Sequence, residues 1–229
     1  MTTRGDDPAS ALIAEMQTYY GRRAEVYDTS MGYDNPAVVR SLEPVFQALC
    51  DEMRGRSVLE IACGPGFWTR RIAEVASAVL ASDYNESVLS VARAKSIDPT
   101  RVTFVRADAY DLSSVDGTFT GAFAVDWLAH VPTSRLEAFL DGLHRRLARG
   151  ARVVFCDQTP RSASITGIHD AEGNHLQERV LPDGSRHRVI KHFFTDSELR
   201  TRFARHTKEI AIRRFGDQHR LMMSYTVGA

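Results

Sequence analysis

The spacing of hydrophobic positions changes along the chain. Apolar residues recur every three or four positions over about 9–20 and 36–53, which predicts two helices. From residue 57 onward, short β-branched runs alternate with further helical stretches, a rhythm typical of right-handed βαβ units and a parallel sheet. The expected strands are 57–61, 78–82, 102–106, 120–125 and 152–156, and the expected helices between them are 68–76, 86–95 and 133–148.

The last third of the chain has a different pattern. Two extended runs, 176–181 and 186–191, flank the turn sequence Pro182-Asp183-Gly184 and predict a β-hairpin. Thr195 or Asp196 can cap a helix that runs to about Ala204, with Glu198 placed for a capping box. Strands at 209–215 and 220–227 follow, and the short connection between them makes the pair antiparallel.

These elements predict an α/β fold with a doubly wound, mostly parallel seven-stranded sheet and an antiparallel C-terminal strand. We expect one domain over 1–229. It comprises an N-terminal helical cap (1–53), a core (57–157), an insertion that covers the substrate (158–192), and a C-terminal helix with antiparallel strands (193–229).

Composition narrows the classes of function. Lys plus Arg equal Asp plus Glu at 29 each, so no basic surface for nucleic acid or an anionic membrane is expected. The three cysteines have no metal-ligand spacing, and the four histidines of the insertion match no ligand motif, so we expect no metal. The N-terminus does not resemble a signal peptide, and no apolar run approaches a membrane span, which favours a cytoplasmic protein.

The segment VLEIACGPGFWT joins a buried strand to a helix through small residues at Ala62, Gly64 and Gly66. Such residues allow a tight turn and a close ligand, at the sheet edge where doubly wound folds bind nucleotides. The Gly-Pro-Gly tripeptide alone is equally consistent with a simple turn.

Two acids end the next two strands. Asp83 can accept hydrogen bonds from ribose hydroxyls, or it can cap the helix that starts near Glu86. Asp108 can accept from an adenine amino group while the backbone N–H of Ala109 meets the ring; taken alone it is simply a loop aspartate. Together with Glu60, these acids mark three successive strand ends and favour a nucleotide-like ligand.

With these motifs assembled, the chain resembles the class I S-adenosylmethionine-dependent methyltransferases that act on small molecules. The resemblance rests on VLEIACGPGFWT, ASDYNESVLSVARAK, VTFVRADAYDL, AFAVDWLAHVP and LARGARVVFCD, in family order. It implies a Rossmann-like fold and S-adenosylmethionine as cofactor, with S-adenosylhomocysteine as product. The departure is Ala62, where the family more often has glycine.

The resemblance also implies roles for individual residues. Glu60 and the 62–66 loop would hold the methionine end of the cofactor, Asp83 the ribose, Tyr84 the adenine face, and Asp108 with Ala109 the adenine edge. The stretch YYGRRAEVYD looks like the segment that covers the cofactor in many small-molecule members, with Tyr20 and Tyr27 over the sulfonium. Alternatively, both tyrosines pack a helix on the core. The full set of expected cofactor contacts is Tyr20, Tyr27, Glu60, Ala62, Gly64, Gly66, Trp68, Asp83, Tyr84, Asp108, Ala109, Asp126 and Trp127.

Methyl transfer needs alignment and exclusion of water, and a base only where the acceptor carries a proton. His130 is the first candidate base, with Tyr20 a weaker one; packing at a helix end is the other interpretation of His130. Trp127, His130 and His169 are the candidate substrate contacts.

The expected acceptor is a nitrogen or oxygen of a small molecule, such as a specialised metabolite of natural-product biosynthesis, handled by a monomer or homodimer. A non-methylating or regulatory S-adenosylmethionine-binding protein of the same fold is the alternative. An NAD(P)-dependent oxidoreductase is disfavoured because the loop lacks the third glycine of that fingerprint and the chain lacks a Tyr-x-x-x-Lys pair.

Overall fold

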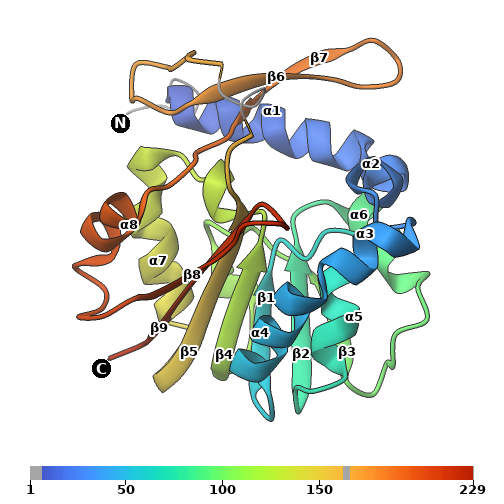
Figure 1. The fold of residues 1–229 in the computed structure, drawn as a ribbon, viewed down its shortest axis with the longest axis vertical. Helices are drawn as coiled ribbons and strands as arrows, with labels where there is room; N and C mark the ends of the chain where they lie inside the picture. The colour runs from blue at the N-terminus through green and yellow to red at the C-terminus, as the bar shows by residue number, and fades with distance from the viewer. Residues whose placement is uncertain (1–6, 162–165, 229) are drawn as a thin grey trace.

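A seven-stranded sheet forms the centre of the molecule (Figure 1). The computed structural model describes residues 7–161 and 166–228. The strand order is β3-β2-β1-β4-β5-β9-β8, and only β9 runs against the others, because it pairs antiparallel with both β5 and β8. The mostly parallel sheet predicted from the sequence is therefore confirmed. The strands are β1 (Ser57–Ile61), β2 (Ala78–Asp83), β3 (Val102–Arg106), β4 (Phe119–Val125), β5 (Leu147–Gln158), β8 (Ala211–Phe215) and β9 (Arg220–Thr226).

Helices cover both faces of this sheet. The helices α4 (Glu43–Met53), α5 (Phe67–Ala73) and α6 (Glu86–Arg93) share a hydrophobic cluster with one face, and α7 (Leu136–His144) and α8 (Asp196–Phe203) with the other. Neighbouring residues of β1 enter opposite clusters, Val58 the first and Leu59 the second, because side chains alternate along a strand. Central strands buried on both faces explain the continuous apolar runs in the sequence.

Two helices differ from their predicted extents. The expected helix 36–53 is divided into α3 (Pro36–Ser41) and α4, with Pro44 in the first turn of α4. Proline has no N–H and clashes with the preceding turn, so the helix restarts there. The expected helix 133–148 is shorter, because a 3₁₀ turn occupies Thr133–Arg135 and Leu147 already pairs with Phe119 as part of β5.

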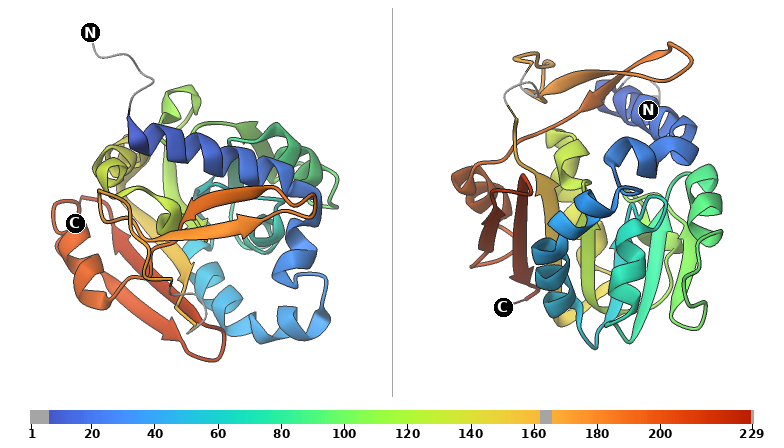
Figure 2. Two further views of the ribbon diagram at one scale, coloured as in Figure 1. Left: turned by 90° about the horizontal axis from the view of Figure 1, so that it is seen from above. Right: turned by 45° about the vertical axis from the view of Figure 1, so that its right-hand side comes forward.

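A second layer lies over the carboxyl end of the sheet. It consists of α1 (Pro8–Arg22), the short α2 (Tyr27–Met31) and the predicted hairpin, formed by β6 (Leu176–Val180) and β7 (Arg186–Ile190). Figure 2 shows α1 and the hairpin side by side in the view from above. We call α1 and the β6–β7 hairpin together the cover.

The cover has its own small core. Glu15 of α1 accepts a hydrogen bond from the backbone N–H of Arg188 over 2.6 Å, and Sδ of Met16 accepts from Ile190 N–H over 3.4 Å. The outer edge of β7 is thereby satisfied by a helix instead of another strand. Apolar side chains from both parts fill the space between them: Leu12, Met16, Tyr19, Leu176, Leu181, Val189 and Ile190.

At the start of α8, the predicted capping box is present: the Thr195 hydroxyl accepts from Glu198 N–H, and the Glu198 carboxylate accepts from Thr195 N–H. None of the helices in residues 7–161 and 166–228 is both long and apolar enough to span a membrane.

Candidate active site

A cavity of about 870 Å³, including its open mouth, lies between the cover and the ends of β1 to β4. The chain fills the sheet from β1 to β3 in one direction and then crosses to β4 and β5 in the other, so β1 and β4 form the topological switch point where doubly wound sheets bind ligands. The lining residues are Ile13, Met16, Gln17, Tyr20, Tyr27, Ala62, Gly64, Pro65, Ser82, Asp83, Tyr84, Asn85, Val88, Ala107, Asp108, Ala109, Tyr110, Val125, Asp126, Trp127 and His130.

The loop after β1 turns through left-handed conformations at Ala62 (φ 52°), Gly64 (φ 57°) and Gly66 (φ 78°). A Cβ atom added at Gly64 would meet nothing within 4 Å, so the backbone there is open to a ligand in the cavity. Ala62 adopts the same backbone region with a side chain, at a cost in strain that glycine would avoid. The loop is thus shaped as expected, with the strain located at the residue that departs from the family pattern.

Asp83 ties this loop to the next strand. Its carboxylate accepts from Gly64 N–H over 3.1 Å and from Asn85 N–H over 2.9 Å, while the side chain also lines the cavity. Burial raises the pKa of Asp83, and hydrogen bonds from backbone N–H groups act in the opposite direction. Asp83 therefore joins the loop after β1 to the residue that precedes α6 and also lines the site of the expected ribose, while the N-cap position of α6 is Asn85 and not Asp83.

Three further expected contacts line the same end of the cavity. Tyr84 is 37% exposed and has the Arg106 guanidinium 5.5 Å from its ring. Asp108 accepts from Tyr110 N–H over 2.9 Å, and Ala109 follows it in the wall. These residues and Gly64 form what we call the nucleotide end of the cavity.

Four residues expected in the site are not among those that line it. Glu60 is buried behind the loop, where burial raises its pKa to about 8 and Oε2 has no hydrogen-bond partner among the described residues. Gly66 supports the start of α5 against Ala92 and Phe104.

The other two residues expected in the site, Trp68 and His169, make their contacts elsewhere. The Trp68 indole packs 4.7 Å from the ring of Phe46 and donates to the Tyr33 hydroxyl over 3.3 Å. His169 is exposed, and its Nδ1 donates to the carbonyl of Gly167 over 3.1 Å. Neither side chain borders the cavity, so their expected contacts are corrected.

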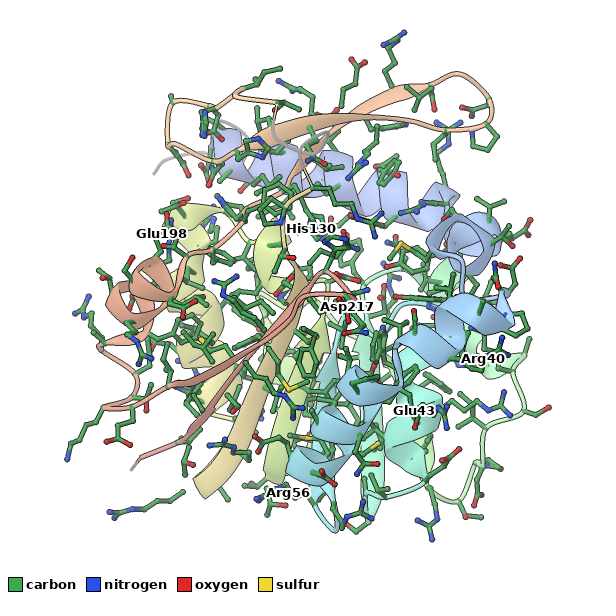
Figure 3. The ribbon with its side chains drawn as sticks, in the orientation of Figure 1. Arg40, Glu43, Arg56, His130, Glu198 and Asp217 are labelled. Atoms are coloured by element: carbon green, nitrogen blue, oxygen red, sulfur yellow. The ribbon has the colours of Figure 1, made fainter. Side chains whose placement is uncertain are left out.

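His130 lies beneath the cover, as Figure 3 shows, and there it meets Tyr20 of α1; both residues line the cavity. Nδ1 of His130 contacts the carbonyl oxygen of Ile190, which can only accept, so the proton lies on Nδ1. The Tyr20 hydroxyl then donates to Nε2 over 3.1 Å. Burial, with a contribution from the positive charge of Lys191, lowers the pKa of His130 to about 3. The imidazole is therefore neutral, with its basic nitrogen occupied.

Asp126 and Trp127 line the cavity beside Tyr20 and His130, and we call these four residues the acceptor end of the cavity. Asp126 adopts φ 55° and forms an ion pair with Arg220 over 2.6 Å. The second carboxylate oxygen of Asp126 and Nε1 of Trp127 are buried without a hydrogen-bond partner among the described residues. The hydroxyl of Tyr110 is likewise buried without a hydrogen-bond partner among the described residues. The ring centres of Tyr110 and Trp127 are 5.6 Å apart. Unpaired buried polar atoms on a cavity wall are suited to a polar ligand.

Sequence reasoning missed a group of buried charges next to this end: Lys191, Asp157 and Arg220, which are 3%, 3% and 4% exposed. Asp157 accepts from Ala129 N–H over 3.1 Å, and burial raises its pKa to about 6. The available signal was the position of each charge beside an otherwise apolar strand. Their proximity depends on strand pairings that the local sequence does not reveal.

Comparisons with known proteins agree with this geometry. Residues 58–150 match the family model described as "Methyltransferase domain". A demethylmenaquinone methyltransferase of Clavibacter sepedonicus is 32% identical over 151 residues, which cover 65% of this chain and 57% of the relative. The O-methyltransferase cnsE of Penicillium expansum is 29% identical over 169 residues, covering 66% and 60%. The matches thus span under two thirds of these relatives' lengths.

Among solved structures, the DhpI-SAM-HEP complex is 28% identical and covers 98% of this chain and 99% of its own, with a TM-score of 0.75. This likeness includes the cover as well as the sheet. Taken with the family match over β1 to β5, it identifies residues 58–150 as a methyltransferase domain of the class I S-adenosylmethionine-dependent type.

Proposed function

We propose that this protein transfers a methyl group from S-adenosylmethionine to an oxygen or nitrogen of a small molecule. The observation that carries the proposal is the cavity itself, with an acid at the ends of both β2 and β3 on one side and a polar, covered acceptor end on the other.

The nucleotide end fits the cofactor. Asp83 would accept from the ribose hydroxyls, Asp108 and Ala109 N–H would meet the adenine edge, and Tyr84 would pack on its face. The open backbone at Gly64 leaves space for the methionine portion. Glu60 does not line the cavity, so it would affect cofactor binding indirectly, through the loop that it supports.

The cofactor supplies the methyl group on a cationic sulfur. The protein's part at the acceptor end is to orient the acceptor and exclude water. Tyr20 and Tyr27 line the cavity and can face the sulfonium with their rings. His130 serves as a fixed partner of Tyr20, since a neutral imidazole with a pKa near 3 is a weak base.

We further propose that α1 from the N-terminal segment and the β6–β7 hairpin from the insertion act together as the substrate cover of one domain. The hydrogen bonds from the edge of β7 to Glu15 and Met16 support this, because they join the two segments directly. The name of the Penicillium expansum relative favours oxygen as the atom methylated.

The test uses the full chain in two measurements. Calorimetry should detect S-adenosylhomocysteine binding, and labelled S-adenosylmethionine should pass its methyl to one of a panel of small acids, alcohols and amines. Binding without turnover of any acceptor would favour the regulatory alternative. Failure to bind S-adenosylhomocysteine would overturn the proposed function.

A further inference from the structure

Lys191 is a buried lysine close enough to act on His130 at the acceptor end of the cavity, although Lys191 itself is not among the residues that line the cavity. It follows β7 directly, and its backbone N–H donates to His175 O over 2.9 Å. The next residue, His192, donates to Ala129 O over 2.8 Å, which fixes this part of the cover beside the loop that carries His130. Lys191 is 3% exposed, and neither Asp126 nor Asp157, the two acids that act on its ammonium group, forms an ion pair with it. A buried charge without a close partner is costly and rarely kept without a use.

The neighbouring acids leave this charge poorly compensated. Asp126 lies close enough to act on Lys191, but its carboxylate is held by Arg220 over 2.6 Å. Asp157 also acts on Lys191, while burial raises the pKa of Asp157 to about 6, so part of its population is protonated near neutral pH. Arg179 of β6 adds a further positive charge near Lys191 and Tyr20. Cationic side chains therefore outnumber the acids around the acceptor end, while burial lowers the pKa of Lys191 itself, so that an anion bound nearby would favour its charged form.

The same end offers no ready base. An alcohol must lose a proton when its oxygen is methylated, and an amine is mostly a cation at neutral pH. Nε2 of His130 already accepts from Tyr20, and its pKa is near 3. A cationic acceptor would be repelled by Lys191 and by the sulfonium of the cofactor. Both observations favour an acceptor that arrives as an anion.

We propose that Lys191 determines the specificity for an oxyanion acceptor, a carboxylate or a phosphate ester, at the Tyr20–His130 end of the cavity. The inference rests on the methyltransferase function proposed above. In the reaction, an anionic oxygen forms its bond to the methyl carbon as the carbon–sulfur bond breaks. The sulfur keeps the bonding pair and becomes a neutral thioether, the acceptor loses one negative charge, and no proton has to move.

The experiment compares four probes of similar length on the wild-type protein loaded with S-adenosylhomocysteine: butanoate, butyl phosphate, 1-butanol and butylamine. Calorimetry should detect binding of at least one anion and of neither neutral nor cationic probe. The two anionic arms separate a planar carboxylate from a tetrahedral phosphate. Labelled S-adenosylmethionine should then give the methyl ester of the anion that binds.

Variants separate recognition from folding. Lys191→Met should weaken binding of the preferred anion by about tenfold or more, and Lys191→Arg should restore most of it. Asp157→Asn keeps an acceptor for Ala129 N–H but removes a negative charge, so it should tighten anion binding. The matched control is Arg186→Met, which removes a cation from β7 that pairs with Glu178 on the surface.

The possible results are distinct. If S-adenosylhomocysteine binds but both anions fail to bind, or if butanol or butylamine is the probe that binds and is methylated, the inference falls while the proposed function stands. Equal anion affinity in Lys191→Met and wild type would mean that Lys191 serves only as a counter-ion to Asp157, which also overturns it. If S-adenosylhomocysteine itself does not bind, the proposed function fails first.

Discussion

The hydroxyl of Tyr20 donates a hydrogen bond to Nε2 of His130 across 3.1 Å, and this contact joins the cover to the loop after β4. Because the carbonyl of Ile190 holds the other ring nitrogen, the imidazole is fixed as a neutral ring between α1 and the end of β7. His130 thus couples the two parts of the cover to the core. The contact has consequences for stability as well as for catalysis.

The first prediction concerns the loss of folding stability at acidic pH. The folded-state pKa of His130 is near 3, below the value of about 6.5 for an unfolded chain. Between these values the unfolded state binds the extra proton, so stability falls as the pH falls through this window. Denaturant unfolding of wild type at pH 7 and 5 should show this loss, and His130→Gln should reduce the loss by about 2 kcal/mol. An equal pH dependence in both proteins would contradict the assignment.

The second prediction concerns Asp83. Asp83→Ala should weaken S-adenosylhomocysteine binding by about tenfold or more, because it removes the expected ribose acceptor and frees Gly64 N–H. Asp98 is the matched control: it accepts from the backbone of Thr100 two residues later, as Asp83 does from Asn85, but it does not line the cavity. Asp98→Ala should leave the affinity unchanged in calorimetry. Similar losses in both variants would indicate a purely structural role.

The third prediction concerns the strained position in the loop. Ala62→Gly should be tolerated, with stability unchanged or raised by up to about 1 kcal/mol, since glycine adopts φ 52° without steric cost. Ala62→Val should destabilise the protein by about 1–3 kcal/mol, because β-branched residues are rarely found at positive φ. Thermal unfolding of the two variants measures the difference. A valine variant as stable as the glycine variant would show that this backbone geometry is wrong.

The fourth prediction concerns the buried ion pair. Arg220→Met leaves Asp126 charged and buried, and should cost about 3–5 kcal/mol of unfolding free energy. The double variant Asp126→Asn with Arg220→Met should recover a large part of this loss, since neither charge remains. Denaturant unfolding of the single and double variants completes the cycle. Additive losses would show that the two residues do not depend on each other.

The sequence predicted the nucleotide end better than the acceptor end, for a physical reason. Asp83 ends β2 and Asp108 follows the end of β3 by two residues, and because the carboxyl ends of parallel strands meet at one edge, their position follows from local pattern. Arg220 and Asp126 are 94 positions apart and meet only because β9 pairs antiparallel with β5. That register is a property of the folded sheet.

For Trp68 and His169, position in the sequence did not predict position in the fold. Trp68 follows the glycine loop directly, yet it lies on the face of α5 that packs against Phe46 of α4. Because successive residues of a helix point in different directions, a position one residue past a binding loop can face the core. His169 belongs to the insertion as expected, but the hairpin brings Ile190 and Lys191, rather than His169, toward His130.

The small core of the cover bears on the order in which the protein is made. Met16 and Ile190 are in contact although 174 positions separate them. During synthesis, α1 emerges before the hairpin, and its apolar face has no partner until the hairpin follows. Contacts between such distant segments form late, since a long loop must close before they are gained. The cover therefore assembles late, and a ribosome-bound chain lacking the hairpin would leave the Leu12–Met16–Tyr19 surface available to chaperones.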